Sequence, residues 1–344
     1  MLGECFRVAV RLCVGLMAMA VGICVAVAEP AVGAVNPDPP RSSGAGARQT
    51  NFYRHYSVCA QVTLFGIPVF SRCGVGGAFA ELSRPDEDEP LWLKFVSGSS
   101  PERAHGLNRL GLILESVRES KNGPITSSYF GFITANNEES VSQGRRALEE
   151  SGRSQDATYS VAEGLIKGSS MSYTTYRIEL PSRYRWSDAS QMLAEVRQQL
   201  KGQPANRHTL DASEAAGAKV ELRTFLYAVR SALVSASTKG DEYVVHNGKL
   251  FQLTWSKSHD TRAQQEFVRA GLAGPSCTAM RMSAVIRNVN SGEQTPFAVW
   301  YDASSQNVLP LRFEFRARSF LKLVFQADPH EAAPPDLEMR ASVR

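Results

Sequence analysis

Residues 309–316 read Leu309-Pro310-Leu311-Arg312-Phe313-Glu314-Phe315-Arg316. From position 311 onward, apolar and charged side chains alternate one by one. Because successive side chains of a strand point to opposite faces of a sheet, this pattern predicts a strand with one apolar and one charged face. Such a strand belongs to an antiparallel sheet that packs one face on a core and leaves the other in water. We interpret the arginines at 312, 316 and 318 as its solvated face.

Further strand patterns lie upstream of this segment. Runs rich in β-branched and aromatic residues, bounded by turn residues, are typical of strands. The Asn247-Gly248 pair between two such runs predicts a hairpin, since both residues readily take the left-handed conformation that a two-residue turn needs. At Gly74, Gly76 and Gly77 we expect bulges or bends of a curved sheet. The predicted strands cover residues 56–64, 69–82, 91–96, 129–133, 158–163, 172–180, 243–245, 249–255, 280–289, 297–301 and 311–316.

Helical patterns are fewer. Apolar residues recur at helical spacing ahead of Gly202, which supplies a stop, and they predict a helix over residues 187–200. Similar spacing predicts helices over 99–117, 136–148 and 220–233. Strands punctuated by a few helices indicate the α+β class. We therefore expect a curved antiparallel sheet, a half-barrel or clamshell, wrapped around a few helices.

The composition is that of an ordinary globular protein: 43% of the 344 residues are hydrophobic and 21% are charged. These values exclude collagen-like, coiled-coil, disordered and polytopic membrane proteins. Removing residues 1–28 takes two Arg and one Glu from 38 basic and 34 acidic residues and leaves a net charge of +3. So small a surplus gives no reason to expect a nucleic-acid or membrane-surface partner.

Residues 1–28 have the pattern of a secretory signal peptide. Arg7 and Arg11 lie before an apolar run that begins at Leu12, and Ala26-Val27-Ala28 forms a small-x-small cleavage site. Two alternatives stay open, an uncleaved anchor helix and lipidation at Cys24. The apolar run is shorter than the ~20 residues that span a bilayer, and the residue before Cys24 is not small, as a lipidation site requires. We expect a periplasmic or secreted protein after cleavage near Ala28.

The rest of the chain divides by composition. Residues 29–50 are rich in Pro, Gly, Ala and Ser, which predicts a flexible linker. A stretch with Gly and Pro around residue 205 separates an N-terminal α+β region, residues 51–205, from a strand-rich C-terminal region, residues 206–328. Residues 329–344 are polar and interrupted by prolines, which is typical of a disordered tail.

Three cysteines remain once the leader is removed: Cys59, Cys73 and Cys277. Cys59 and Cys73 lie at equal distances from Gly66, so a hairpin folded there places them opposite each other. Outside the cytoplasm such a pair can form a disulfide; two buried thiols are the alternative. We interpret Cys277 as a small buried hydrophobe rather than as a nucleophile.

The sequence contains no Gly-x-Ser-x-Gly, His-Glu-x-x-His, Walker or Cys-x-x-Cys motif. No two of its six histidines have the spacing of metal ligands. His246 and His259 fall beside turn residues, and we expect both at the surface. We predict no catalytic residues, no metal site, no cofactor and hence no enzyme. A hydrolase whose site gathers dispersed residues is the alternative.

Aromatic residues concentrate in the C-terminal strands. A half-open sheet that carries so many can line a cavity for an acyl chain or another apolar ligand. The other interpretation is that these residues form the core against the helices. The candidate ligand-binding residues are Phe225, Trp255, Trp300, Phe313 and Phe315.

The C-terminal half carries Leu-Tyr-x-x-Arg at residues 226–230, an Asn-Gly-Lys turn at 247–249 and Leu-Pro-Leu-Arg at 309–312. With residues 297–302 and the opening turn at 66–69, these motifs resemble exported bacterial proteins of the domain of unknown function 3108 family. That family is distantly similar to the lipoprotein carriers LolA and LolB, which shelter acyl chains in a concave apolar cavity. The resemblance implies a curved antiparallel sheet around helices, and it implies no catalytic residues.

From these observations we expect an exported envelope protein that binds an apolar or lipid-like ligand in the concavity of its sheet, without catalysis. The partner that we expect is such a ligand; we expect no nucleic acid and no integral membrane segment, and the sequence identifies no protein partner. The alternative is a protein-binding envelope scaffold with a fully packed interior. A cavity too small for an acyl chain would favour that alternative.

Overall fold

A computed structural model describes residues 50–64, 67–86, 88–104, 109–119, 124–134, 156–181, 184–203, 207–213, 220–305, 308–318 and 321–329. The predicted signal peptide and the predicted helix over 136–148 lie outside the described residues. So do nearly all of the predicted linker and tail.

The strands of the described residues form one 15-stranded sheet in the order β8-β7-β6-β5-β4-β3-β2-β1-β15-β14-β13-β12-β11-β10-β9. Their bounds are β1 (Thr50–Leu64), β2 (Ile67–Arg84), β3 (Leu91–Ser99), β4 (Leu110–Arg118), β5 (Thr126–Thr134), β6 (Asp156–Lys167), β7 (Ser170–Pro181), β8 (Arg207–Asp211), β9 (Leu222–Thr224), β10 (Lys239–His246), β11 (Lys249–His259), β12 (Ala279–Asn288), β13 (Gln294–Asp302), β14 (Arg312–Arg318) and β15 (Leu321–Ala327).

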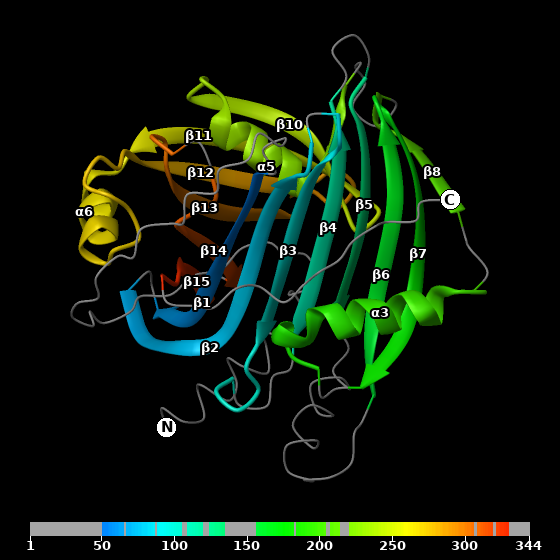
Figure 1. Cartoon of the computed structure of the whole chain (residues 1–344), viewed down its shortest axis with the longest axis horizontal. Helices are drawn as coiled ribbons and strands as arrows, with labels where there is room; N and C mark the ends of the chain where they lie inside the picture. The colour runs from blue at the N-terminus through cyan, green and yellow to red at the C-terminus, as the bar shows by residue number, and fades with distance from the viewer. Residues whose placement is uncertain are drawn as a thin grey trace, which may run out of the picture.

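The first and last strands pair with each other in the middle of this sheet. From there β1 to β8 run outward in chain order on one side, and β15 back to β9 run outward on the other. Neighbouring strands are antiparallel except β9 and β10, which are parallel. Figure 1 shows β3–β8 standing upright, with β10–β15 crossing at a steep angle behind them. One core cluster contains residues from β1–β4 and from β10–β15, which shows that the sheet folds back on itself.

The described helices are α3 (Ala189–Leu200), α5 (Phe225–Val234), α6 (Thr261–Arg269) and the short 3-10 helix η3 (Trp186–Asp188). Helix α3 covers one face of the β2–β7 half, where Met192, Leu193 and Val196 join the core. Helix α5 packs on the opposite face, in the core that the two halves share. The predicted helices over 187–200 and 220–233 correspond to α3 and α5, whereas α6 is not predicted.

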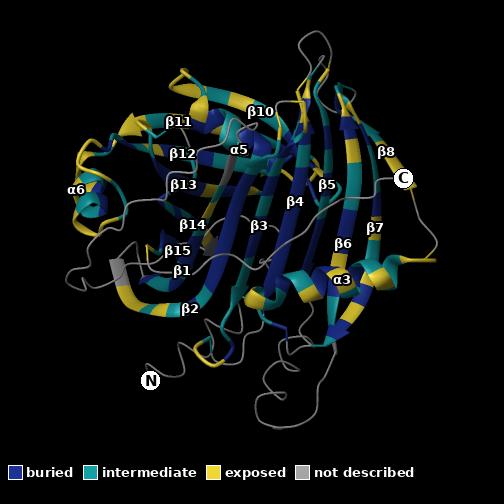
Figure 2. Ribbon diagram, viewed as in Figure 1, coloured by how far each residue is buried: buried dark blue, intermediate teal, exposed yellow. Residues whose placement is uncertain are grey.

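The expected α+β class is wrong: the chain is mainly β, one large sheet rather than a sheet wrapped around helices. The main error lies in the predicted helix over 99–117, where the structure has strand β4. Helix α3 covers one face of β4 and α5 the other, so nearly the whole strand is buried (Figure 2). A strand buried on both faces loses the polar–apolar alternation, and periodicity alone cannot distinguish it from a buried helix.

The Asn247-Gly248 hairpin is confirmed. Strands β10 and β11 pair around a turn in which Asn247 has a φ of 48° and Gly248 a φ of 70°. The expected bulge near the glycines of β2 is also present, because the β1–β2 register shifts between Val58 and Cys59 and Gly74 has a φ of 68°. At these two places, the conformations that Asn and Gly readily adopt determine the turn and the bulge.

Candidate functional site

The space between α5 and the strands that face it is where an apolar ligand is expected. It measures about 70 Å³. By comparison, an engineered cavity of about 150 Å³ holds one benzene, and sites for drug-sized ligands measure about 300–1,000 Å³. The space therefore has no room for an acyl chain. Its lining includes Leu82, Phe95, Phe225, Val229, Val299 and Phe313.

Four of the five predicted ligand residues, Phe225, Trp255, Phe313 and Phe315, lie together in the shared core, and all four are buried. They pack against other side chains; the Phe313 ring stacks on Tyr56 with centroids 4.9 Å apart. Trp300 lies on the opposite face of the sheet, in a separate cluster with α6. Adjacent positions of a strand point to opposite faces, so Trp300 cannot join the core that its neighbour on β13 enters.

A buried carboxylate fixes α5 in the interior. The backbone N–H groups of Leu226 and Tyr227 donate to the Glu115 carboxylate on β4, both at 2.9 Å. The first turn of a helix leaves N–H groups without partners and favours a nearby negative charge. The Tyr227 hydroxyl also donates to Glu119, at 2.7 Å. Sequence analysis missed this anchor, because Glu115 falls within the segment predicted as a helix.

Burial changes the acid–base chemistry of this interior. It raises the pKa of Glu115 to about 7, although hydrogen bonds from the first turn of α5 favour the ionised form. Burial also lowers the pKa of His246 to about 4, with a smaller contribution from the charge of Lys249. His246 packs beside Phe225, with ring centroids 5.7 Å apart, so its expected place at the surface is wrong. His259 is exposed, as expected.

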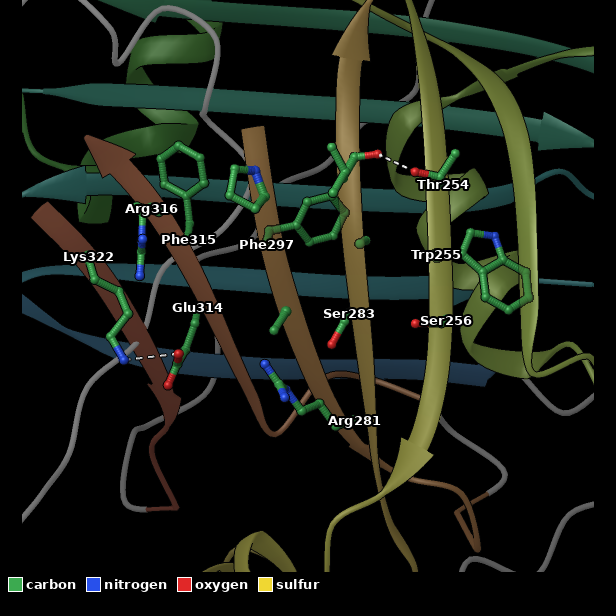
Figure 3. A pocket seen from close by; sticks show the side chains of 14 residues that line it. Thr254, Trp255, Ser256, Arg281, Ser283, Phe297, Glu314, Phe315, Arg316 and Lys322 are labelled. Atoms are coloured by element: carbon green, nitrogen blue, oxygen red, sulfur yellow. Dashed lines mark hydrogen bonds and ion pairs between the residues drawn. The ribbon is translucent and has the colours of Figure 1, made fainter. Parts of the chain in front are cut away.

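An open groove of about 610 Å³ lies on the outer side of β11–β15 (Figure 3). Its floor follows one row of the register, in which Ser256 pairs with Ser283 and Ser283 pairs with Ala298. Larger side chains border this row, with Arg281 and Trp300 paired in the row on one side. The small floor residues between larger neighbours account for the depth of the groove.

Charged side chains from three strands line the same groove. Lys322 on β15 forms an ion pair with Glu314 on β14, with an N–O distance of 3.0 Å. Arg281 on β12 and Arg316 on β14 are exposed, and neither forms a hydrogen bond or an ion pair with another described residue. Figure 3 shows both arginine side chains pointing toward the part of the groove that holds Glu314. The lining is therefore more basic than acidic.

Helix α6 and Trp300 hold one border of the groove in place. The Trp300 indole donates to Asp260 at 2.8 Å, and Asp260 also caps the first turn of α6. The guanidinium groups of Arg281 and Arg312 lie 5.1 and 5.7 Å from the Trp300 ring centre. Arg312 also forms an ion pair with Glu266 of α6 at 2.9 Å. Arg312 is therefore half-buried in a network rather than simply solvated.

Burial by itself would raise the pKa of Asp260. The hydrogen bonds from α6 and Trp300, with the charges of Arg281 and Arg312, nevertheless hold that pKa below its usual value. Asp260 is therefore ionised at neutral pH. Its negative charge is stabilised at the N-terminus of α6, where the helix dipole is positive.

The cysteines take two different positions. Cys59 on β1 and Cys73 on β2 are register partners and form a disulfide. Cys277 is free and buried in the cluster with α6. Burial, with a smaller contribution from Asp302, raises the pKa of the Cys277 thiol to about 11. A thiol with so high a pKa is mostly protonated at neutral pH and is a poor nucleophile.

Comparison with known proteins finds a distant likeness in structure. No protein-family model matches the chain, and no curated protein matches it. A solved structure from Brucella abortus, a β-barrel-like protein of the domain of unknown function DUF1849, superposes with a TM-score of 0.40 at 6% identity. The superposition covers 80% of this chain and 94% of that one. The resemblance to the domain of unknown function 3108 family stays a prediction.

Within the described part of the chain, no helix combines the length and the apolar character that crossing a bilayer requires.

Proposed function

We propose that this chain is an exported, non-catalytic protein of the cell envelope that keeps its interior packed and binds another protein on its outer surface. The observation that carries the proposal is the contrast between two spaces. The interior space beside α5 measures about 70 Å³, and the outer groove of β11–β15 measures about 610 Å³. Of the two, the outer groove has the volume of a binding site.

Export and a periplasmic or secreted location rest on the leader pattern of residues 1–28. The non-catalytic part of the proposal is supported by the chemistry of Cys277, whose buried, protonated thiol suits packing better than nucleophilic attack. The packed interior is supported by the aromatic contacts of Phe313 with Tyr56, Phe95 and Phe325.

The rival function, binding of a lipid in the interior, provides the test. The full chain is purified without detergent, its organic extract is examined for lipid by mass spectrometry, and the protein is titrated with a solvatochromic acyl probe. We expect no stoichiometric lipid and no saturable rise in probe fluorescence. Stoichiometric lipid in the extract, or saturable probe binding by the wild type, would overturn the packed interior.

A variant that enlarges the interior makes this negative result interpretable. Phe225 lines the interior space and is 6% exposed, so Phe225→Ala leaves a larger cavity in its place. We expect this variant to bind the acyl probe better than the wild type does. Equal, tight probe binding by both proteins would mean that the native interior already holds an acyl chain.

A further inference from the structure

We infer that the outer groove of β11–β15 accepts an acidic segment of a partner protein; the inference rests on the proposed function and specifies the chemistry of its partner. The charged residues that line the groove are Arg281, Arg316, Lys322 and Glu314. Lys322 and Glu314 neutralise each other in their ion pair. Arg281 and Arg316 then leave two positive charges that no ion pair within the described residues neutralises. Carboxylates of a partner supply the complementary charge.

The positions of the two arginines favour an extended ligand. By register, Arg316 on β14 is level with Val285 on β12, which is four residues along the strand from Arg281. With about 3.4 Å per residue and about 4.8 Å between strands, the two Cα atoms lie roughly 17 Å apart. A chain with several spaced carboxylates matches this separation better than a single small anion does.

The floor of the groove suits a polypeptide backbone. The hydroxyls of Ser256 and Ser283 face the groove, and neither makes a hydrogen bond with another described residue. A peptide offers amide groups to these hydroxyls and carboxylates to the arginines. Arg–carboxylate pairs are often bidentate and are stronger than neutral hydrogen bonds. The combination of free hydroxyls and free guanidinium groups therefore matches an acidic peptide.

Arg281 is held ready for such a contact. Its guanidinium group lies 5.1 Å from the centre of the Trp300 ring, and Trp300 is fixed by its hydrogen bond to Asp260. Asp260 is the nearby acid, and its charge interacts with that of Arg281, but the two side chains form no ion pair; Asp260 instead accepts from Trp300 and from the first turn of α6. A side chain that is already ordered loses less conformational entropy on binding.

The test is fluorescence anisotropy with a labelled oligoglutamate peptide and the full chain at low ionic strength. A peptide of the same length with Gln at every position is the uncharged control. We expect saturable binding of the Glu peptide alone, weakened about tenfold by the double substitution Arg281→Gln/Arg316→Gln and by a rise from about 0.05 to about 0.5 M salt. Arg207→Gln is the matched control, because Arg207 is exposed on β8, at the edge of the sheet on the other side from β11–β15, and does not line the groove. We expect this control to change the dissociation constant less than about twofold.

A second variant separates the groove from general charge attraction. Ser283→Leu fills the floor and keeps every charge, and we expect it to weaken peptide binding as well. Equal binding by the wild type, the double variant and Ser283→Leu would overturn the inference. So would a preference for polygalacturonate or for vesicles with anionic lipid over the peptide. If any of these outcomes occurs while the acyl probe still finds no site, the ligand assignment fails and the packed interior stands.

Discussion

Glu115 shows how one residue can link the two halves of this molecule. Its carboxylate stands on β4 in the N-terminal half and accepts the backbone N–H groups of Leu226 and Tyr227 in α5. Burying a carboxylate costs free energy unless hydrogen bonds compensate for lost water. Here burial prevails, since the pKa is raised to about 7. The fold is therefore more stable with Glu115 protonated, because the neutral acid avoids the cost of burying a charge, even though hydrogen bonds to the ionised form are stronger.

We predict that Glu115 makes stability fall between about pH 4.5 and pH 7. A folded pKa of about 7 against an ordinary value of 4.5 means that the folded chain holds the proton more tightly than the unfolded chain does. The contribution is complete below pH 4.5 and is lost as the pH rises to 7, on the order of 3 kcal/mol in total. Urea unfolding of the wild type and of Glu115→Gln at several pH values measures it.

Across this window the unfolding free energy of the wild type should fall relative to that of Glu115→Gln, whose side chain cannot ionise, and above about pH 7 the difference should stay constant. Glu119→Gln is the control, because the hydrogen bond from Tyr227 holds the pKa of Glu119 below its usual value and moves its titration below the window. A difference for Glu115→Gln that does not change with pH would contradict the prediction.

At the scale of elements, the sequence predicts those with a local signal. The 311–316 alternation, the Asn247-Gly248 turn and the α3 spacing each depend on neighbours in the chain, and each corresponds to an element of the structure. The prediction for the residues of β4 is wrong because the burial of this strand depends on α3 and α5, which lie far away in the sequence. Of the groove, the sequence indicates only a charged face on β14, since the floor of Ser256, Ser283 and Ala298 exists only through the register of three strands.

The β1–β2 hairpin is a second element whose stability can be tested. Its disulfide joins residues 14 positions apart, and closing a loop of about that length stabilises a fold by about 3 kcal/mol through the unfolded state. We predict that a reductant lowers the free energy of unfolding by about this amount. The variant Cys59→Ala/Cys73→Ala should unfold identically with and without reductant. A wild type whose unfolding is insensitive to complete reduction would contradict the expected contribution.

At the scale of the whole molecule, the decisive feature is the pairing of β1 with β15. This pairing joins residues 56–62 to residues 321–327. The first and the last strand in sequence therefore lie side by side in the middle of the sheet. No local pattern specifies that pairing, so the sequence predicts a curved sheet but neither its order nor its size. Folding back of the sheet leaves its aromatic residues packed against one another and against α5. The aromatic residues of the C-terminal strands suggest a ligand cavity at this place, but the space beside α5 measures only about 70 Å³.

The free energy of unfolding of Phe313→Ala, measured in urea, tests the packed interior most directly. Phe313 is 5% exposed and lines the interior space. Removing a packed Phe side chain costs about 3–5 kcal/mol. We predict a loss in that range for Phe313→Ala, and a loss below about 1 kcal/mol for Leu165→Ala, since Leu165 is 44% exposed. A loss below about 1 kcal/mol for Phe313→Ala would show that the side chain borders an open ligand cavity, and would contradict the account.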